Sequence, residues 1–144
     1  MTTVHSSPPA AEADPFWEAL ERGVLLIIRC DSCDRAALPL TRSCPHCGSP
    51  DVHPEEAGGG GSVYSWVTVH VPLDPAFAAD VPYTILAVTL DEGVRVFGRL
   101  TGAAPAAIVA GLRCELAPLQ VHGRTVPAFC PSPGPASIDR KSVV

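Results

Sequence analysis

Four cysteines arranged as two close pairs constrain this chain more than any other feature. The pairs, ten residues apart, are Cys30 with Cys33 and Cys44 with Cys47. A two-residue gap lets one tight turn direct both sulfurs toward the same point, and a tetrahedral zinc ion takes four thiolates at about 2.3 Å. Pro45 presets a turn dihedral, and Gly48 lets the chain leave the turn. The spacing therefore predicts a structural zinc ion bound by all four cysteines.

A zinc ion with four protein ligands has no position left for a catalytic water, so we expect this site to stabilise the fold without performing chemistry. His46 lies between two of the ligands and is expected to face solvent. Two disulfides would instead require an oxidising compartment, which nothing else in the chain indicates. Cys114 and Cys130 lie in apolar, strand-like segments and are expected to be buried free thiols.

The composition favours a folded domain without a basic binding face. Hydrophobic residues make up 47% of the 144 residues and charged residues 17%, which is enough to bury the core of one domain or of two very small ones. The net charge is −5, and the nine arginines are scattered singly, with Lys141 as the one lysine. A protein that binds a phosphate backbone usually carries a clustered basic face. Nucleic acid is therefore an unfavoured partner.

Neither a membrane span nor a secretory signal is expected from the sequence. No apolar run reaches the length that a spanning helix needs, and the first fifteen residues lack a basic segment followed by an apolar one. Together with the metal-type cysteines, this predicts a protein of the reducing cytoplasm.

The N-terminal part predicts a tail and one short helix. Residues 1–13, rich in Pro, Ala, Ser and Thr, are predicted to be disordered. Asp14 is a favourable N-cap, Pro15 suits the first helical position, and Gly23 can end the helix. A helix and a zinc ribbon are therefore predicted over residues 14–56. The prediction combines the helix signals, the two cysteine turns and the strands expected at 24–29 and 36–40.

Phe16 and Trp17 lie on this predicted helix, in a stripe with Leu20. Two interpretations are open for these aromatic side chains. They pack on their own domain, or they form part of the interface with a partner protein, because aromatic residues dominate the energetics of interfaces.

Residues 57–62, Ala-Gly-Gly-Gly-Gly-Ser, form the clearest boundary in the sequence. Four consecutive glycines lose much backbone entropy in a strand or helix, so we expect a flexible joint here. Residues 63–131 then predict a five-stranded OB-type barrel, and residues 132–144 a flexible tail. The expected strands are 63–71, 83–90, 94–100, 112–116 and 125–129, with a short helix at 105–110 between the third and fourth strands.

The predicted barrel carries several polar and aromatic residues that are candidates for a site. Segment 63–71 alternates cleanly, which predicts Val63, Val67 and Val69 on one face and Tyr64, Trp66 and His70 on the other. Asp91 and Glu92 are expected to point apart into solvent at a hairpin tip. His70 and His122 show no carboxylate companion in the sequence. These residues predict no catalytic site, and the chain by itself is not expected to be an enzyme.

Two function classes remain after this reading. A zinc ribbon and an OB barrel with Tyr64, Trp66 and His70 on one face could bind single-stranded nucleic acid. The net negative charge of the chain instead favours a binding or scaffold subunit. In such a subunit the structural metal would stabilise the surface that carries the exposed aromatic helix.

The chain resembles the DUF35 family in the order of its motifs, from about residue 14 to residue 131. These motifs are Pro-Phe-Trp, Cys-x-x-Cys, Cys-Pro-x-Cys-Gly, Gly-Ser-Val-Tyr-Ser-Trp-Val-Thr-Val, Leu-Asp-Glu-Gly-Val-Arg-Val, Gly-Leu-Arg-Cys-Glu-Leu and Val-Pro-Ala-Phe. The Leu-Asp-Glu-Gly block is the most specific of them, whereas the cysteine pairs are shared with many ribbons.

This resemblance implies a rubredoxin-like zinc ribbon followed by an OB fold. It further implies a non-catalytic subunit in a hetero-oligomer with a thiolase-like enzyme, such as a lipid-transfer-type thiolase or aldolase of steroid degradation, an archaeal thiolase–synthase complex, or an acyltransferase of polyketide pathways. Some members bind or help to place acyl-CoA. Only Cys30, Cys33, Cys44 and Cys47 match family positions with an assigned role, zinc ligation. Arg95, Arg99 and Arg113 are candidate anion contacts, with solvent-facing strand positions as the other interpretation.

Overall fold

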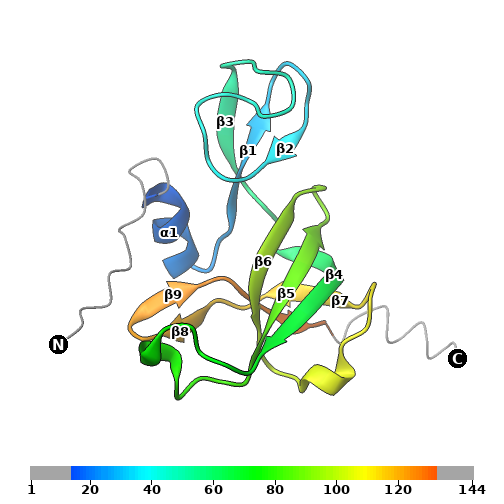
Figure 1. Ribbon diagram of the computed structural model, residues 1–144. Helices are drawn as coiled ribbons and strands as arrows, with labels where there is room; N and C mark the ends of the chain where they lie inside the picture. The colour runs from blue at the N-terminus through cyan, green and yellow to red at the C-terminus, as the bar shows by residue number, and fades with distance from the viewer. Residues whose placement is uncertain (1–13, 133–144) are drawn as a thin grey trace, which may run out of the picture.

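The chain folds into a three-stranded ribbon above a five-stranded barrel, with a short helix where the two meet (Figure 1). The computed structural model describes residues 14–132, so the tail expected at 1–13 and nearly all of that expected at 132–144 lie outside the described residues. The predicted fold class is confirmed. The elements are α1 (Asp14–Glu21), β1 (Leu26–Cys30), β2 (Ala36–Ala37), β3 (Val52–Glu56), β4 (Gly60–Val69), a 3-10 helix (Pro75–Phe77), β5 (Tyr83–Leu90), β6 (Arg95–Leu100), a second 3-10 helix (Pro105–Ala107), β7 (Arg113–Leu116), β8 (Leu119–Val121), β9 (Arg124–Val126) and β10 (Ala128–Pro131).

Helix α1 ends in the glycine cap that the sequence predicts. Gly23 has a φ of +85°, and its N–H donates to the carbonyl of Leu20 at 2.9 Å. The N–H of Val24 donates to the carbonyl of Ala19, also at 2.9 Å. This pair of bonds is the Schellman pattern, which a residue in the left-handed conformation makes possible. The cap turns the chain directly into β1.

The ribbon has the strand order β2-β1-β3, with β1 in the centre. Strand β2 covers only Ala36–Ala37, which is shorter than the expected return strand at 36–40, because the Leu38-Pro39 segment leaves the sheet. Strand β3 was not predicted, and Pro54 within it argues against a strand in the sequence. The proline is tolerated because β3 is an edge strand, where a missing N–H donor is not needed.

The barrel closes in the order β10-β6-β5-β4-β7, with β10 parallel to β6. Strand β5 has the bounds that the sequence predicts, and β6 begins one residue later than expected. The fifth barrel strand is β10, Ala128–Pro131, and not the predicted segment 125–129. The reason is that β9 pairs with β8 in a separate two-stranded hairpin, which takes Thr125 out of the barrel.

Strand β4 does not alternate as expected. Val63 pairs with Val88 and Ser65 pairs with Ala87, so Tyr64 is the extra residue of a β-bulge. Beyond the bulge Trp66 pairs with the fully buried Leu86, whereas the Val67 side chain is 59% exposed. The clean alternation predicted for 63–71 is therefore wrong, because one inserted residue moves every later side chain to the other face.

The last glycines of the 57–62 segment belong to the barrel. Strand β4 begins at Gly60 and pairs there with β7. A Cβ atom at Gly61 would lie 2.6 Å from the carbonyl oxygen of Thr89 and 2.8 Å from Cγ1 of Val88. The second half of the expected joint 57–62 is therefore a strand, and the close approach of β5 requires a residue without a side chain at Gly61.

Replacement of Gly61 by alanine is expected to lower the free energy of unfolding by about 1–3 kcal/mol, the usual cost of overpacking a filled site. Gly58→Ala is the matched control, because its added Cβ would have only Glu92 Oε2 within ordinary contact distance, at 3.7 Å. The control should change stability by less than about 0.5 kcal/mol. Denaturant unfolding of both variants provides the measurement, and equal effects would contradict the packing of Gly61 within the barrel.

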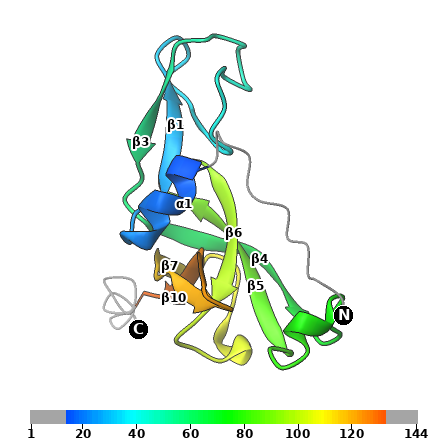
Figure 2. The ribbon, with the colours of Figure 1, turned by 90° about the vertical axis from the view of Figure 1, so that its left-hand side faces the viewer.

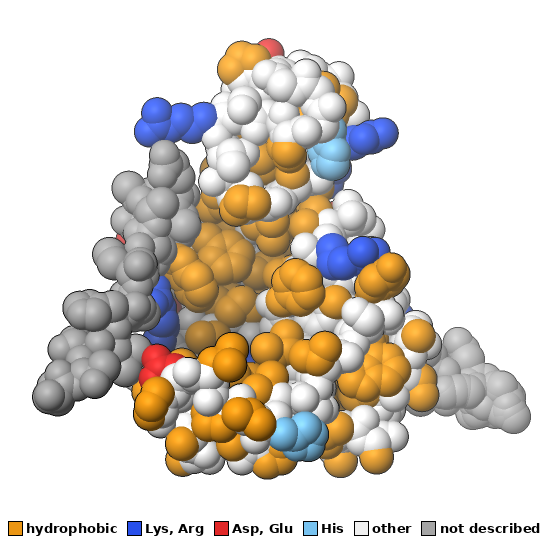
Figure 3. Space-filling model, in the orientation of Figure 1, with side chains coloured by type: hydrophobic (Ala, Val, Ile, Leu, Met, Phe, Trp, Pro, Cys, Tyr) orange, Lys and Arg blue, Asp and Glu red, His pale blue; other side chains and the backbone are white. Residues whose placement is uncertain are grey.

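Helix, ribbon and barrel share one hydrophobic core. The cluster joins Leu20 and Leu25 from the N-terminal part to Leu86 and Phe129 of the barrel. Figure 2 shows α1 at the level where the ribbon meets the barrel, and Figure 3 shows a hollow lined by hydrophobic side chains between them. None of the helices in the described part of the chain has the length and hydropathy of a membrane span.

Candidate metal centre and adjoining cleft

The four predicted cysteines converge at the tip of the ribbon. Their sulfur atoms all lie within 4.8 Å of one another. The distance from Cys30 Sγ to Cys47 Sγ is 3.6 Å, and that from Cys33 Sγ to Cys44 Sγ is 3.7 Å. A tetrahedron with metal–sulfur bonds of about 2.3 Å has edges of about 3.8 Å, so the four sulfurs fit a zinc ion at their centre. The ribbon is a structural zinc site.

Backbone amides face the sulfurs, as expected for cysteine turns of this spacing. Cys30 Sγ accepts from the N–H of Cys33 at 3.4 Å and from that of Ser32 at 3.3 Å. The hydrogen bond from Cys33, with that from Ser32, lowers the pKa of Cys30 to about 7 against the opposing effect of burial. Cys44 Sγ accepts from the N–H of His46 at 3.3 Å. These donors stabilise the thiolate form that a zinc ion requires.

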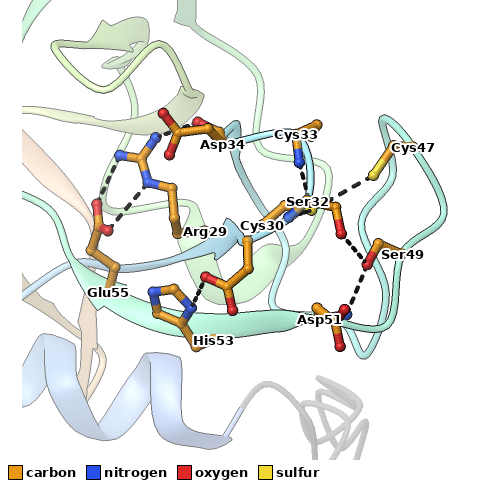
Figure 4. A network of polar contacts seen from close by, with 11 residues as sticks. Arg29, Cys30, Ser32, Cys33, Asp34, Cys47, Ser49, Asp51, His53 and Glu55 are labelled. Carbon is orange, nitrogen blue, oxygen red and sulfur yellow. Dashed lines mark hydrogen bonds and ion pairs between the residues drawn. The ribbon is translucent and has the colours of Figure 1, made fainter.

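A polar network around Cys30 holds the metal-binding turns in place (Figure 4). Arg29 donates to both carboxylate oxygens of Glu55, at 3.2 and 2.9 Å, and to the carbonyl of Asp34 at 2.9 Å. Ser32 Oγ donates to Ser49 Oγ at 2.9 Å, which connects the two cysteine turns to each other. The exposed His46 contacts the carbonyl of Ala36 through Nε2 at 3.3 Å and is not among the metal-binding side chains.

An apolar cleft of about 390 Å³ lies directly below the ribbon, where Figure 3 shows the hollow. Phe16 and Trp17 line it from α1, and their rings meet edge to face at a centroid distance of 5.1 Å. Both side chains are half-buried and pack against the shared core. Both residues thus pack on their own domain and also line an open cleft, and their role in a partner interface stays a prediction. The full lining is Phe16, Trp17, Leu38, Pro39, Leu40, Arg95, Val96 and Phe97.

The β8–β9 hairpin supports the helix from below. The guanidinium of Arg124 lies 4.8 Å from the centroid of the Trp17 ring. At the turn of the same hairpin His122 and Gly123 both have positive φ, +52° and +80°, which suits a tight two-residue connection. His122 Nε2 lies 2.7 Å from Asp80 Oδ2. The expectation that His122 has no carboxylate companion is wrong, because the fold brings together residues 42 positions apart.

The Asp91-Glu92-Gly93 segment forms the predicted hairpin turn, and both of its carboxylates also accept hydrogen bonds from other parts of the fold. Asp91 accepts two hydrogen bonds from Arg113, at 2.8 and 2.9 Å. Glu92 Oε2 accepts from the N–H of Gly58 at 2.8 Å, which ties the hairpin to the segment between ribbon and barrel. The expected solvent exposure holds for Asp91, whose side chain is 57% exposed, whereas Glu92 is half-buried. Both carboxylates accept hydrogen bonds that stabilise the fold.

The three candidate anion-binding arginines differ in their surroundings. Arg113 is paired with Asp91, and Arg99 lies 3.8 Å from Asp80 and 3.9 Å from the centroid of the Tyr83 ring. Arg95 lies 3.6 Å from the centroid of the Tyr64 ring. The described residues include no ion pair to Arg95, so of the three it is the guanidinium with the most freedom to bind an external anion.

The remaining two cysteines are free thiols. Cys114 is buried, and desolvation raises the pKa of its thiol to about 11. Cys130 is half-buried, so the expectation of full burial is correct for Cys114 only.

Replacement of Asp91 by asparagine is expected to lower the free energy of unfolding at pH 7 by less than about 1 kcal/mol, since the ion pair with Arg113 is exposed. Hydrogen bonds from Arg113 hold the pKa of Asp91 below its usual range. The stabilisation is therefore present above the pKa of an unfolded aspartate, about 3.9, and is lost as the pH falls through the lower folded-state value. Wild type and variant should converge in acid, as measured by urea unfolding. Glu115→Gln on the neighbouring strand is the control, and a difference that persists below about pH 3 would contradict this assignment.

Two family models match adjacent parts of the chain. Residues 17–53 match the rubredoxin-like zinc ribbon domain of ChsH2, and residues 54–117 match the C-terminal OB-fold domain of ChsH2. Their boundary lies within β3, three residues before the predicted joint.

Two curated proteins and one solved structure resemble this chain over most of its length. A probable enoyl-CoA hydratase alpha subunit of Thermomonospora curvata is 40% identical over 127 residues, 86% of this chain, which spans only 39% of that longer protein. A DUF35 domain-containing scaffold protein of Methanocaldococcus jannaschii is 33% identical over 97 residues, 66% of this chain and 67% of that protein. The solved structure of an Ltp2-ChsH2(DUF35) aldolase contains a chain with a TM-score of 0.74 and 36% identity, covering 87% of this chain and 98% of that one. The protein described here belongs to the DUF35 family, with a ribbon and an OB-fold domain of the ChsH2 type.

Proposed function

We propose that this protein is a non-catalytic accessory subunit that docks on a thiolase-superfamily enzyme and helps it to bind or position acyl-CoA substrates. The observation that carries the proposal is the apolar cleft lined by Phe16 and Trp17, in a chain whose metal site has all four positions taken by protein sulfurs. The metal stabilises the surface, and the surface contacts the partner.

The composition of the cleft supports docking. Seven of its eight lining residues are hydrophobic, and the Phe97 ring beside it is 67% exposed. Aromatic side chains in such clefts commonly supply most of the binding energy of an interface. An exposed apolar hollow of this kind is typical of a site that another chain covers.

The names of the relatives support the class of partner. One is a subunit of a probable enoyl-CoA hydratase, one is a scaffold protein, and the solved structure is of an aldolase. The first name refers to a CoA thioester, which supports a CoA-dependent enzyme as the partner. The thiolase class that we propose for this enzyme rests on the resemblance to the DUF35 family.

A single-stranded nucleic acid is a weaker candidate, because the bulge breaks up the aromatic face expected on β4. Arg95 stacks on the Tyr64 ring, and Tyr64, as the bulged residue, no longer alternates with Trp66, which is 38% exposed and pairs with the buried Leu86. The net charge of −5 also opposes binding to phosphates. None of the six cysteines forms a disulfide, which suits the reducing cytoplasm that we propose as the compartment.

Reconstitution with the candidate partner tests this function. The thiolase-like enzyme alone, this protein alone and their stoichiometric mixture are assayed for turnover of an acyl-CoA. We expect no turnover by this protein alone, and a kcat/KM of the mixture at least about tenfold above that of the enzyme alone, equivalent to about 1.4 kcal/mol. Turnover by this protein alone, or a mixture that behaves like the enzyme alone, would overturn the proposal.

A further inference from the structure

Strand β6 has an open edge beside the cleft. It pairs with β5 from Arg95 to Arg99 along one side. On its other side β10 pairs only with Arg99 and Leu100. In the described part of the chain, residues 95–98 therefore have a strand neighbour on one side only.

The direction of the backbone groups on this edge follows from one hydrogen bond. The N–H of Arg99 donates to the carbonyl of Pro127 at 2.9 Å, so Arg99 directs its backbone groups away from β5. In an antiparallel pair the residues of one strand point their N–H and C=O alternately toward the neighbour and away from it. Phe97 and Arg95 thus also direct theirs away from β5. The open edge therefore presents two N–H donors and two C=O acceptors, those of Arg95 and Phe97.

The apolar cleft lies along the same edge, since Arg95, Val96 and Phe97 all line it. Phe16 and Trp17 form the facing wall (Figure 3 shows the hollow). An extended segment that pairs with the edge would place alternate side chains against this wall, as in other cases of strand addition. Unpaired strand edges are otherwise short, charged or covered, because they bind other chains readily.

The one charged side chain of the cleft indicates which side chains a complementary segment would have. Arg95 is the single charged residue of the lining, and no carboxylate is paired with it among residues 14–132. The whole chain, in contrast, has a net charge of −5. The cleft therefore complements a segment with apolar residues and one acidic residue near Arg95.

We propose that an extended segment of the partner enzyme adds to the open edge of β6 as a further strand, pairing its backbone with Arg95 and Phe97, filling the cleft with apolar side chains and placing a carboxylate at Arg95. This inference rests on the proposed function for its partner. It adds the mode of binding, which the function alone does not specify.

Residue-resolved amide hydrogen exchange tests the pairing directly. The full-length protein is measured free and in complex with the thiolase-like enzyme. We expect exchange at Arg95 and Phe97 to slow at least about tenfold in the complex, because their N–H groups gain acceptors. Val96 and Gly98 already pair with β5 and provide the internal control, with a smaller change.

Each other outcome overturns a distinct part of the argument. If the complex forms and exchange at Arg95 and Phe97 is unchanged, strand addition is wrong while the proposed function stands. If no complex forms, the proposed function fails together with this inference. If both amides are already protected in the free protein, and lose protection when residues 1–13 or 133–144 are removed, the occupant is a segment of the same chain.

Two variants test the side-chain part of the proposal. Arg95→Glu and Phe97→Ala alter exposed side chains and are expected to weaken the complex at least about tenfold in Kd. Val109→Ala removes a comparably exposed hydrophobic side chain outside the cleft lining and should leave the Kd unchanged. Equal affinities for all three variants would exclude the cleft as the binding site.

Discussion

Replacement of Cys44 by serine is expected to remove the zinc ion and unfold the ribbon. Cys44 is an almost fully buried member of the cluster, and a serine hydroxyl does not supply the thiolate that the metal needs. The ribbon has only three short strands, so much of its folding free energy must come from the metal. Structural zinc contributes about 10–16 kcal/mol in zinc-finger peptides at neutral pH.

The measurement is the metal content per chain, together with thermal unfolding. Cys130→Ser is the matched control, because Cys130 is a free thiol outside the cluster. The control should retain one zinc ion per chain, whereas Cys44→Ser should lose it and expose the sulfurs of the three remaining ligands to thiol reagents. A Cys44→Ser protein with one zinc ion and an unchanged Tm would show that the cluster has been misassigned.

Replacement of both Phe16 and Trp17 by alanine is expected to abolish co-purification with the partner enzyme. The two rings form one wall of the cleft, and their removal takes away both the apolar surface and its shape. Truncation of one interface hot spot costs about 2–4 kcal/mol, so loss of two should weaken the complex at least about a hundredfold. Affinity capture followed by titration provides the measurement.

The rings also pack on the shared core, so loss of fold must be separated from loss of binding. The double variant should retain its zinc ion and its β-sheet circular dichroism, with a lower Tm. Leu73→Ala is the control, because Leu73 is fully exposed and lies outside the cleft. A double variant that still captures the partner with wild-type affinity would remove this surface from consideration.

Features that depend on neighbouring residues were predictable from the sequence. The cysteine spacing indicates the zinc site because the turn geometry is local, and the glycine cap of α1 follows from Gly23 alone. Strand β5 carries β-branched residues up to the turn at Asp91, so its bounds were correct. The resemblance to DUF35 added the order of the two domains.

Features that depend on tertiary contacts were not predictable in the same way. The bulge at Tyr64 leaves no mark in the hydrophobic pattern, and the need for glycine at Gly61 comes from strand β5 beside it. The pair of Asp91 and Arg113 joins residues 22 positions apart. The β8–β9 hairpin leaves only a weak signal in the sequence, the turn at Gly123, because the strands on either side are very short.

The cleft illustrates the same division. The sequence places Phe16 and Trp17 on a helix, but it does not show that the open edge of β6 lies opposite them. That relation arises only when the ribbon, the helix and the barrel share a core.

Affinity capture of this protein from its native host at physiological salt tests the central claim most directly, with the eluate analysed by mass spectrometry and for nucleic acid. We predict recovery of a thiolase-like protein in stoichiometric amount and no nucleic acid. Recovery of nucleic acid that is lost at higher salt, without such an enzyme, would contradict the assignment as an accessory subunit and indicate that the barrel binds single strands.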